Sequence, residues 1–231
     1  MRIDFHTHLL PGVDDGSQSV AESQQLLNAL RSQEVELAIA TPHFYSAKAS
    51  LDEFLQRRDA AYAQLQAEVK PLTPKLLLGA EVSFFRGMHN ADRLQELCIA
   101  DTSALLLEMP FSQWGQGELT ELQQLLNRGV TPIIAHVERY FSYQKDMSAF
   151  LEIINLPVIL QVDTEALMQR KTRKLVFRLI EQDFPVLLGT DCHDIKKRKP
   201  DMDAACKILR TKFGDACMEQ IDSLGAQLLH N

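Results

Sequence analysis

The chain has 231 residues, with 45% hydrophobic and 24% charged residues and a formal net charge of -7. This length suits a single domain over residues 1–231, because α/β barrels commonly occupy about 200–250 residues as one unit. The negative charge argues against nucleic acid as a partner, since surfaces that bind nucleic acid are typically basic. No apolar run approaches the roughly 20 residues of a membrane-spanning helix, so membrane insertion is also excluded. Nothing in these patterns predicts a particular oligomeric state.

Cysteine usage indicates the compartment. The four cysteines, Cys98, Cys192, Cys206 and Cys217, form no C-x-x-C pair, and the opening Met-Arg-Ile-Asp-Phe-His has no apolar signal stretch. Both observations favour a reduced, cytoplasmic protein.

Short apolar segments alternate with longer amphipathic segments along the chain. We expect strands at 2–6, 36–41, 75–81, 103–108, 131–136, 157–163 and 186–191. We expect helices near 20–33, 51–69, 118–128, 146–154, 172–183, 202–212 and 215–224. Capping-box patterns, Ser19 with Glu22 and Ser50 with Glu53, begin the first two helices. This alternation predicts a parallel α/β architecture, and apolar runs such as Ile133–Ala135 suit strands covered on both faces. Periodicity alone leaves open whether the sheet is open or closed into a barrel.

Each expected strand ends in residues that can bind a metal ion. In strand order these are His6 and His8, His43, Glu81, Glu108, His136, Asp163, and Asp191 with His193. In a barrel of parallel strands all the carboxyl ends meet at one mouth, where such folds carry their chemistry. One carboxylate at a strand end is commonplace, whereas repetition at every strand predicts a shared site.

Two of these strand ends carry a pair of candidate ligands. His6 and His8 are two positions apart, as are Asp191 and His193, so on an extended chain each pair faces one side. Two such side chains can bind the same ion. Taken singly, a histidine at such a position is as well explained by hydrogen bonds in the core.

Carboxylates complete the donor set. Glu81 and Glu108 follow apolar runs, where an unpaired carboxylate is costly to bury. An ion pair with Arg or Lys is one solution, and bridging two cations beside the imidazoles is the better one. A mixed nitrogen and oxygen set without a thiolate suits manganese, iron or zinc rather than calcium. The residues alone do not distinguish these three metals. Asp14 and Asp15, before Gly16, indicate on this evidence alone a polar turn.

The opening of the chain resembles the polymerase-and-histidinol-phosphatase (PHP) superfamily. The residues concerned are Asp4-Phe5-His6-Thr7-His8 and Pro11-Gly12-Val13-Asp14-Asp15-Gly16. Further motifs resemble the bacterial tyrosine phosphatases of capsule and exopolysaccharide operons. They are Ala40-Thr41-Pro42-His43, Gly79-Ala80-Glu81, Ala135-His136-Val137-Glu138-Arg139-Tyr140 and Thr190-Asp191-Cys192-His193. The resemblance extends from residue 1 to about residue 203. It implies a distorted seven-stranded (β/α) TIM-like barrel, the PHP fold.

The resemblance also implies a site with up to three metal ions. We therefore expect two or three divalent ions, manganese first, with iron and zinc as alternatives. His6, His8, Glu81 and Asp191 would hold the first ion, Glu81 would bridge to a second with Glu108 and His136, and Asp15, His43 and His193 would hold the third. Asp14 is the alternative to Asp15. Arg139 and Arg198 resemble the family's phosphate-contacting arginines. The chain departs from the family at Val137, where Pro is frequent, and at Asp163, where Asn is usual.

The donor set and the resemblance together predict a metal-dependent protein-tyrosine phosphatase that hydrolyses phosphotyrosine with ion-activated water and no covalent phosphoenzyme. The expected partner is the tail of a tyrosine kinase of exopolysaccharide or capsule synthesis. A small-molecule phosphomonoesterase of the histidinol-phosphate type is the alternative on the same site, and a metal-binding module for a kinase is the non-enzymatic one. Cys192 and Arg198 have the C-x5-R spacing of thiol-dependent phosphatases. The segment between them lacks the glycine that a tight phosphate-binding loop usually needs.

Overall fold

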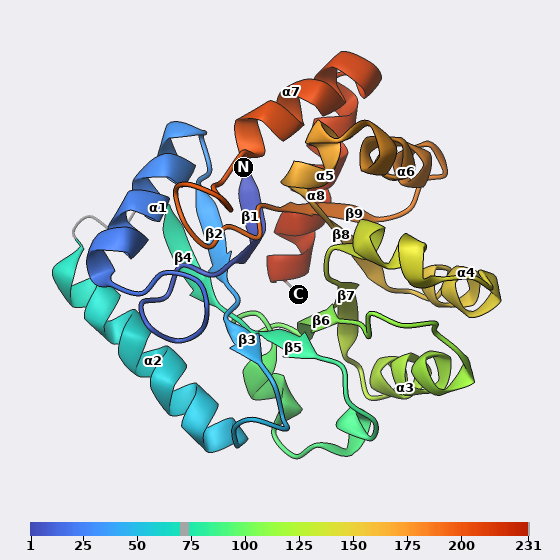
Figure 1. Ribbon diagram of the computed structural model, residues 1–231, viewed down its shortest axis with the longest axis horizontal. Coiled ribbons are helices and arrows are strands. Elements are labelled where there is room, and N and C mark those ends of the chain that lie inside the picture. Colours follow the sequence, from blue (N-terminus) through green and yellow to red (C-terminus); the bar gives the residue numbers. More distant parts are fainter. Residues whose placement is uncertain (70–73, 231) are drawn as a thin grey trace.

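The computed structural model describes residues 1–69 and 74–230 and places its strands in two parallel sheets (Figure 1). The strands are β1 (Ile3–Thr7), β2 (Leu37–Ala40), β3 (His43–Phe44), β4 (Lys75–Leu78), β5 (Glu81–Ser83), β6 (Ala104–Glu108), β7 (Thr131–Ile134), β8 (Ile159–Asp163) and β9 (Val186–Gly189). One sheet has the order β1-β2-β4 and the other has the order β3-β5-β6-β7-β8-β9. All strand pairs within both sheets are parallel, as predicted.

Two of the expected strands, 36–41 and 75–81, each contain a strand that is followed after two residues by a second, shorter strand. β2 and β3 are separated by Thr41 and Pro42, and β4 and β5 are separated by Gly79 and Ala80. Pro42 has no N–H for a ladder, so it interrupts the strand. Each broken segment therefore begins in the first sheet and ends in the second. The seven expected segments are all strands, but these two breaks were not predicted.

The two sheets also approach each other at β1 and β9. A single parallel bridge joins Thr7 to Cys192, and the N–H of His8 donates to the carbonyl of Cys192 at 3.0 Å. The architecture is thus α/β with two parallel sheets that meet at this bridge.

Helices surround the strands (Figure 1). They are α1 (Val20–Ser32), α2 (Leu51–Glu68), α3 (Gln116–Asn127), α4 (Ser148–Ile154), α5 (Thr164–Met168), α6 (Arg170–Glu181), α7 (Met202–Phe213) and α8 (Asp215–His230). The helix expected at 172–183 starts earlier and is preceded by the short α5, because Gln169 between them is extended. Three 3-10 helices, Met88–Asn90, Leu94–Leu97 and Val137–Tyr143, were not predicted, since they are too short for a periodic pattern.

The structure contains one of the two predicted capping boxes in full and the other in part. At the start of α2 the Ser50 side chain accepts from the backbone of Glu53, and the Glu53 side chain accepts from the backbone of Ser50. At the start of α1 Ser19 accepts from the backbone of Glu22, but Glu22 accepts from Gln18 instead. The capping box of α2 is therefore complete, and the capping box of α1 is only half formed.

Alternate strand residues pack into two apolar layers. Leu105 and Leu107 belong to the larger layer, which includes buried side chains of most of the helices, whereas Leu106 belongs to a smaller layer. Leu224 and Leu228 of α8 pack against this smaller layer. A Cβ on Gly225 would lie 2.7 Å from the ring of Phe5, so α8 needs glycine there to approach β1. The strands are thus covered on both faces, and their polar ends remain free to form a site.

Candidate metal centre

The ends of the strands bring together all the metal ligands predicted from the sequence. The side chains are His6, His8, Asp15, His43, Glu81, Glu108, His136, Asp191 and His193. Most of them are buried, whereas Asp15 is 66% exposed. Three groups among them have ligand atoms within 4.8 Å of one another. These groups are His8 with Asp15, His43 and His193; His6 with His8 and Glu81; and His43 with Glu81 and Glu108.

Two imidazole nitrogens of β1 and its end face each other. His6 Nε2 lies 3.0 Å from His8 Nε2. The Nδ1 of His6 lies 3.0 Å from Gln161 Oε1, an oxygen that also accepts from the backbone N–H of His136 at 2.7 Å. The proton of His6 therefore belongs on Nδ1. The Nδ1 of His8 donates in the same way to Asp14 Oδ2 at 2.7 Å.

When both rings are neutral, each Nε2 presents its lone pair to the other. That arrangement is repulsive unless a proton or a metal ion lies between the two nitrogens. Two nitrogens at about 2.1 Å from one ion and at a right angle to each other are roughly 3.0 Å apart. The observed separation is that of two ligands of one metal ion, so the residues fit the predicted group.

Carboxylate oxygens approach the same point. Glu81 Oε2 lies 3.2 Å from His6 Nε2 and 3.3 Å from His8 Nε2. Asp191 Oδ1 lies 3.5 Å and 3.3 Å from the same two atoms. Neither of these two buried oxygens has a well-aligned hydrogen bond within the described residues, although Glu81 Oε2 also lies 2.7 Å from His43 Nδ1. A buried polar atom without a partner costs about 1–3 kcal/mol, and coordination to a cation removes that cost.

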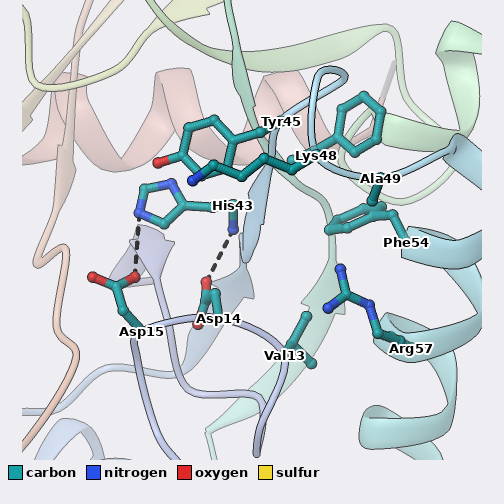
Figure 2. Close-up of a pocket in the computed structure, with 10 residues that line it drawn as sticks. Val13, Asp14, Asp15, His43, Tyr45, Lys48, Ala49, Phe54 and Arg57 are labelled. Atoms are coloured by element: carbon teal, nitrogen blue, oxygen red, sulfur yellow. Dashed lines mark hydrogen bonds and ion pairs between the residues drawn. The ribbon is translucent and has the colours of Figure 1, made fainter.

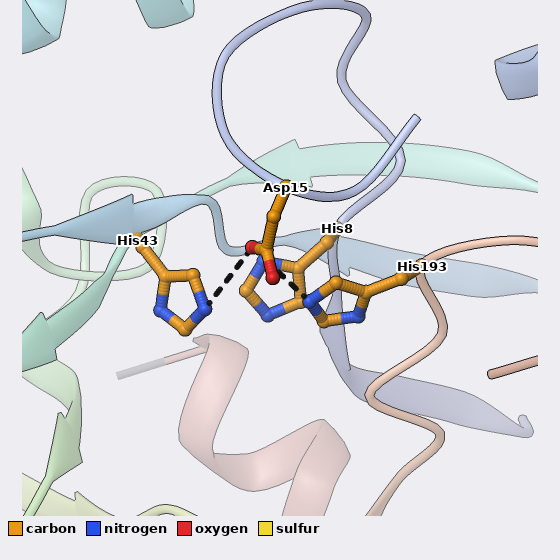
Figure 3. Close-up of side chains that lie close together, drawn as sticks. All are labelled: His8, Asp15, His43 and His193. Carbon is orange, nitrogen blue, oxygen red and sulfur yellow. Dashed lines mark ion pairs between the residues drawn. The ribbon is translucent and has the colours of Figure 1, made fainter. Parts of the chain in front are cut away.

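A second group of donors lies beside the first. Asp15 Oδ1 is 3.5 Å from His43 Nε2 and 3.5 Å from His193 Nε2. Figure 3 shows this carboxylate between the two rings, with His8 behind it. The structure thus groups Asp15, His43 and His193 as the prediction for the third ion did, and it adds His8. The assignment of single ligands to single ions stays a prediction.

The remaining carboxylates complete the arrangement. Glu81 Oε1 lies 2.8 Å from His136 Nε2, and Glu108 Oε1 lies 3.9 Å from the same nitrogen. Glu81 is therefore in contact with histidines from three other segments, since its second oxygen is 2.7 Å from His43 Nδ1. This position between the groups is the one expected of a bridging ligand.

Two of the predicted ligands have left-handed backbone conformations. His136 has φ 33 and Asp191 has φ 50. Such conformations are uncommon for residues with a Cβ and concentrate at functional sites. Each residue lies two positions after the end of its strand, β7 or β9, and the turn in the backbone aims its side chain into the cluster.

Burial and charge shift the pKa values in opposite directions across the cluster. Burial disfavours the charged form of His6, but the carboxylates of Glu81 and Asp191 outweigh it and raise the pKa of His6 to about 9. Burial opposes ionisation of Glu81 as well, yet His6, His136 and His43 hold its pKa well below the usual range. Burial and the neighbouring His8 lower the pKa of His193 to about 4. In the metal-free protein, protons on the histidines supply the positive charge beside the carboxylates, and a metal ion must displace them when it binds.

The two arginines predicted to contact phosphate share one anchor. Arg139 Nη2 and Arg198 Nη2 each lie 2.6 Å from Asp191 Oδ2, and Arg139 also pairs with Asp163. Their side chains are 36% and 37% exposed, so each guanidinium keeps free donors at the mouth. The ion pair with Arg139 gives Asp163, a departure from the family pattern, a positioning role that the sequence did not indicate.

A pocket of about 440 Å³ adjoins the metal centre (Figure 2). His43 and Asp15 form its border with the centre, and Tyr45, Lys48 and Arg57 are among its other lining residues. The Nζ of Lys48 lies 4.1 Å from the centroid of the Tyr45 ring. The pocket therefore offers aromatic walls and cationic groups directly beside the candidate ligands.

The comparisons with known proteins agree with this geometry. A family model described as "Capsular polysaccharide synthesis, CpsB/CapC" matches residues 2–229. The chain belongs to the CpsB/CapC family. It is 25% identical over 234 residues to the tyrosine-protein phosphatase CpsB of Streptococcus agalactiae serotype III (strain NEM316), covering 97% of this chain and 96% of the relative.

Solved structures extend the likeness of this CpsB/CapC family member. The crystal structures of YwqE from Bacillus subtilis and CpsB from Streptococcus pneumoniae, unique metal-dependent tyrosine phosphatases, include a chain with a TM-score of 0.86 and 25% identity. The match covers 99% of this chain and 94% of that one. An organophosphorus hydrolase mutant, at a TM-score of 0.57 and 14% identity over 95% of this chain and 89% of its own, shares the fold alone.

Three positioning residues of this CpsB/CapC member were missed by sequence reasoning. Gln161 fixes the His6 ring, and Asp14, expected only as an alternative ligand, fixes the His8 ring and accepts from the N–H of His43. Asp4 accepts from the N–H and the hydroxyl of Thr190, which ties β1 to the end of β9. Burial raises the pKa of Asp4 to about 7. A polar residue inside an apolar strand was the signal available for Asp4 and Gln161.

Cys192 does not have the surroundings of a nucleophile. Its side chain is fully buried, and burial with the neighbouring Asp4 raises the pKa of its thiol far above the usual range. Reactive cysteines need a lowered pKa and some exposure. The C-x5-R spacing is thus incidental in this CpsB/CapC family member.

Proposed function

We propose that this CpsB/CapC family member is a metal-dependent tyrosine phosphatase that hydrolyses phosphotyrosine in a protein. The observation that carries the proposal is the pair of facing nitrogens of His6 and His8, 3.0 Å apart, with buried oxygens of Glu81 and Asp191 within 3.5 Å of both. The relatives reported above are named as tyrosine-protein phosphatases, and a structure at 25% identity is called metal-dependent. Helices long and apolar enough to cross a membrane are absent from the described residues.

Bound ions would supply Lewis acidity toward the phosphoryl group and a lower pKa for water. The residues proposed to hold them are those of the sequence prediction. His6, His8, Glu81 and Asp191 would hold the first ion. Glu81 would also hold a second ion with Glu108 and His136, and Asp15, His43 and His193 would hold a third. Manganese is the ion we propose first.

The arginines would bind the phosphate directly. Asp191 holds Arg139 and Arg198 side by side through one oxygen. Guanidinium groups match phosphate oxygens with paired donors. Two such groups at the rim of the centre would orient the phosphoryl group toward the cluster and stabilise the charge that develops on its oxygens.

The surroundings of the centre favour an aromatic leaving group. Phe111 stacks on His136 with ring centroids 5.8 Å apart, and on the other side Tyr45 lies 5.2 Å from His43. Both rings follow strand ends, and Tyr45 lines the 440 Å³ pocket. Trp114, by contrast, is 2% exposed and belongs to the core. A phosphate carried on a tyrosine ring reaches past such walls, whereas one carried on serine is shorter by the length of that ring.

We further propose a substrate protein, a cellular compartment and a closed barrel topology. The family description points to capsular polysaccharide synthesis, and we propose the tail of a tyrosine kinase of that process as the substrate, in the cytoplasm. For the fold we propose the distorted seven-stranded barrel. The two broken segments and the Thr7–Cys192 bridge support it, because they make the strand positions follow one another around one ring.

Substrate preference tests the proposal. The purified protein, reconstituted with Mn²⁺, is assayed on matched phosphotyrosine and phosphoserine peptides and on histidinol phosphate. We expect turnover of the phosphotyrosine peptide well above the other two, and loss of that turnover with a chelator. Faster turnover of histidinol phosphate, with equal rates on the two peptides, would establish the small-molecule alternative.

A further inference from the structure

Helix α6 concentrates positive charge in an acidic chain. Its sequence RKTRKLVFRLIE carries five lysine or arginine residues and one acidic residue, whereas the whole chain has a net charge of -7. We define the α6–α7 basic face as Arg170, Lys171, Arg173, Lys174 and Arg178 of α6 with Lys207 of α7. In the described part of the chain, the ion pairs of these helices join Lys212 to Glu181, Arg210 to Asp215 and Asp203 to Arg2. They leave the charges of this face uncompensated.

The distribution of charge along α6 works against the stability of the helix. The first turn contains no acidic residue, although the partial positive charge at a helix N-terminus favours one. Arg170 and Lys174 are four positions apart, as are Lys174 and Arg178, and like charges at this spacing repel. Residues that break a local rule without a compensating contact are expected where function requires them.

A groove lies between α6 and α7. It has a volume of about 710 Å³, and Phe177 and Ile208, both half-buried, supply apolar walls. Arg173, Lys207 and Lys212 surround these walls. A second hollow of about 400 Å³ on α6 is lined by Leu175 and cationic side chains, including Lys174 and Arg178. Apolar walls with cationic rims fit a chain segment that combines carboxylates with an apolar or aromatic side chain.

The face begins beside the metal centre. α5 starts immediately after Asp163, the partner of Arg139, and α6 follows after Gln169. α7 starts at Met202, shortly after the arginine Arg198 of the mouth. Both helices therefore lead away from the mouth, and α6 alone is about 18 Å long at roughly 1.5 Å per residue. A segment bound along the face would reach the mouth with its adjoining residues.

We propose that the α6–α7 basic face docks an acidic segment of the protein substrate, with an apolar or aromatic side chain of that segment in the groove between the helices. This inference rests on the proposed function, since it gives the phosphotyrosine protein a second point of attachment. Charge complementarity selects the acidic chain. A peptide is favoured over a membrane surface, because membrane binding needs several exposed apolar side chains. Among the exposed large apolar side chains of the described residues, Met168, 37% exposed, is the one beside α6.

The experiment uses a random copolymer of glutamate and tyrosine. Binding of the unphosphorylated, fluorescently labelled copolymer is measured by anisotropy and does not require catalysis. The variant Arg173→Glu/Lys207→Glu reverses the charge on both sides of the groove. It should fold, because a glutamate near the start of α6 suits the helix dipole. The control, Arg31→Glu/Lys75→Glu, makes the same change in net charge at exposed sites on α1 and β4.

We expect the Kd for the copolymer to rise about tenfold in the groove variant and to stay near the wild-type value in the control, because each reversal removes an attraction and adds a repulsion. Binding to wild type should weaken with added salt, as screening requires. The KM for the phosphorylated copolymer should rise in parallel, while hydrolysis of p-nitrophenyl phosphate is unchanged.

Equal Kd values for wild type and groove variant would overturn the docking role. Binding to phosphatidylserine vesicles that is lost in the groove variant, with copolymer binding unchanged, would assign the face to a membrane and overturn it too. Failure of the proposed function is separate, since it appears as intact copolymer binding without hydrolysis of the phosphorylated form.

Discussion

Gln161 is the residue whose replacement best separates the metal centre from the fold around it. It is fully buried, its Oε1 accepts from His6 Nδ1 at 3.0 Å and from the His136 N–H at 2.7 Å, and its Nε2 donates to Asp163 at 3.1 Å. Gln161→Leu keeps a similar volume but removes all three bonds. The His6 ring then loses the contact that keeps its proton on Nδ1 and its lone pair toward the cluster.

The loss of metal affinity and of stability can be estimated from the bonds that the substitution removes. Partners that orient a metal-bound histidine typically contribute about 10–100-fold to metal affinity, which is roughly 1.4–2.7 kcal/mol. The backbone N–H of His136 and the ring N–H of His6 are also left buried without acceptors, at about 1–3 kcal/mol each. We therefore expect Mn²⁺ to bind about 10–100-fold more weakly, and the metal-free variant to unfold at a lower denaturant concentration.

Competition with a fluorescent chelator measures the affinity, and Gln144→Leu is the matched control. Gln144 is also buried and accepts from the Trp114 N–H at 2.9 Å while donating to the Ser112 carbonyl at 3.0 Å, away from the cluster. The control should lose stability and keep its affinity for Mn²⁺. An unchanged affinity in Gln161→Leu, or the same loss in both variants, would show that Gln161 does not position His6 for metal binding.

Three further predictions concern single groups. Cys192→Ser should keep most of the activity, because the thiol is buried with a raised pKa; inactivity in a folded variant that still binds metal would support a thiol nucleophile. Arg139→Ala should lower kcat/KM for a phosphotyrosine peptide by on the order of 100-fold at constant metal content, and an unchanged value would remove this arginine from phosphate binding. In the metal-free protein the pKa of His6 is raised from 6.5 to about 9, so its stabilising contribution is complete below pH 6.5 and is lost as the pH rises through 9. The loss is about 3 kcal/mol, and urea unfolding at about pH 6 and about pH 10 measures it; equal stabilities would contradict the shift.

Much of the fold could be predicted because the strands are apolar on both faces. Runs such as Leu105–Leu107 and Ile133–Ala135 mark strands between helices, and the structure confirms a strand in each expected segment. The interruption at Pro42 was less visible, since it falls where the strand ends and its polar residues begin. The exchange of a segment between sheets depends on pairing with distant strands, and local sequence does not report such pairing.

For the candidate site, too, one part could be predicted from the sequence and another part could not. The types of residue at the strand ends, such as His6, His8 and Glu81, indicated the ligands because parallel strands end at one mouth. The roles of Gln161 and Asp14 were not predictable, since they depend on distances between segments. Gln161 reaches His6 across 155 positions of the chain. That both arginines would meet one oxygen of Asp191 is likewise a property of the folded arrangement.

Anomalous diffraction from crystals grown with Mn²⁺ tests the central claim most directly. We predict peaks within about 2.0–2.3 Å of the Nε2 atoms of His6 and His8, with Glu81 and Asp191 oxygens in the same coordination shell, in protein that hydrolyses a phosphotyrosine peptide. Fully active crystals without a peak at this point, in which the two imidazoles are hydrogen-bonded to each other, would contradict a metal centre at His6 and His8.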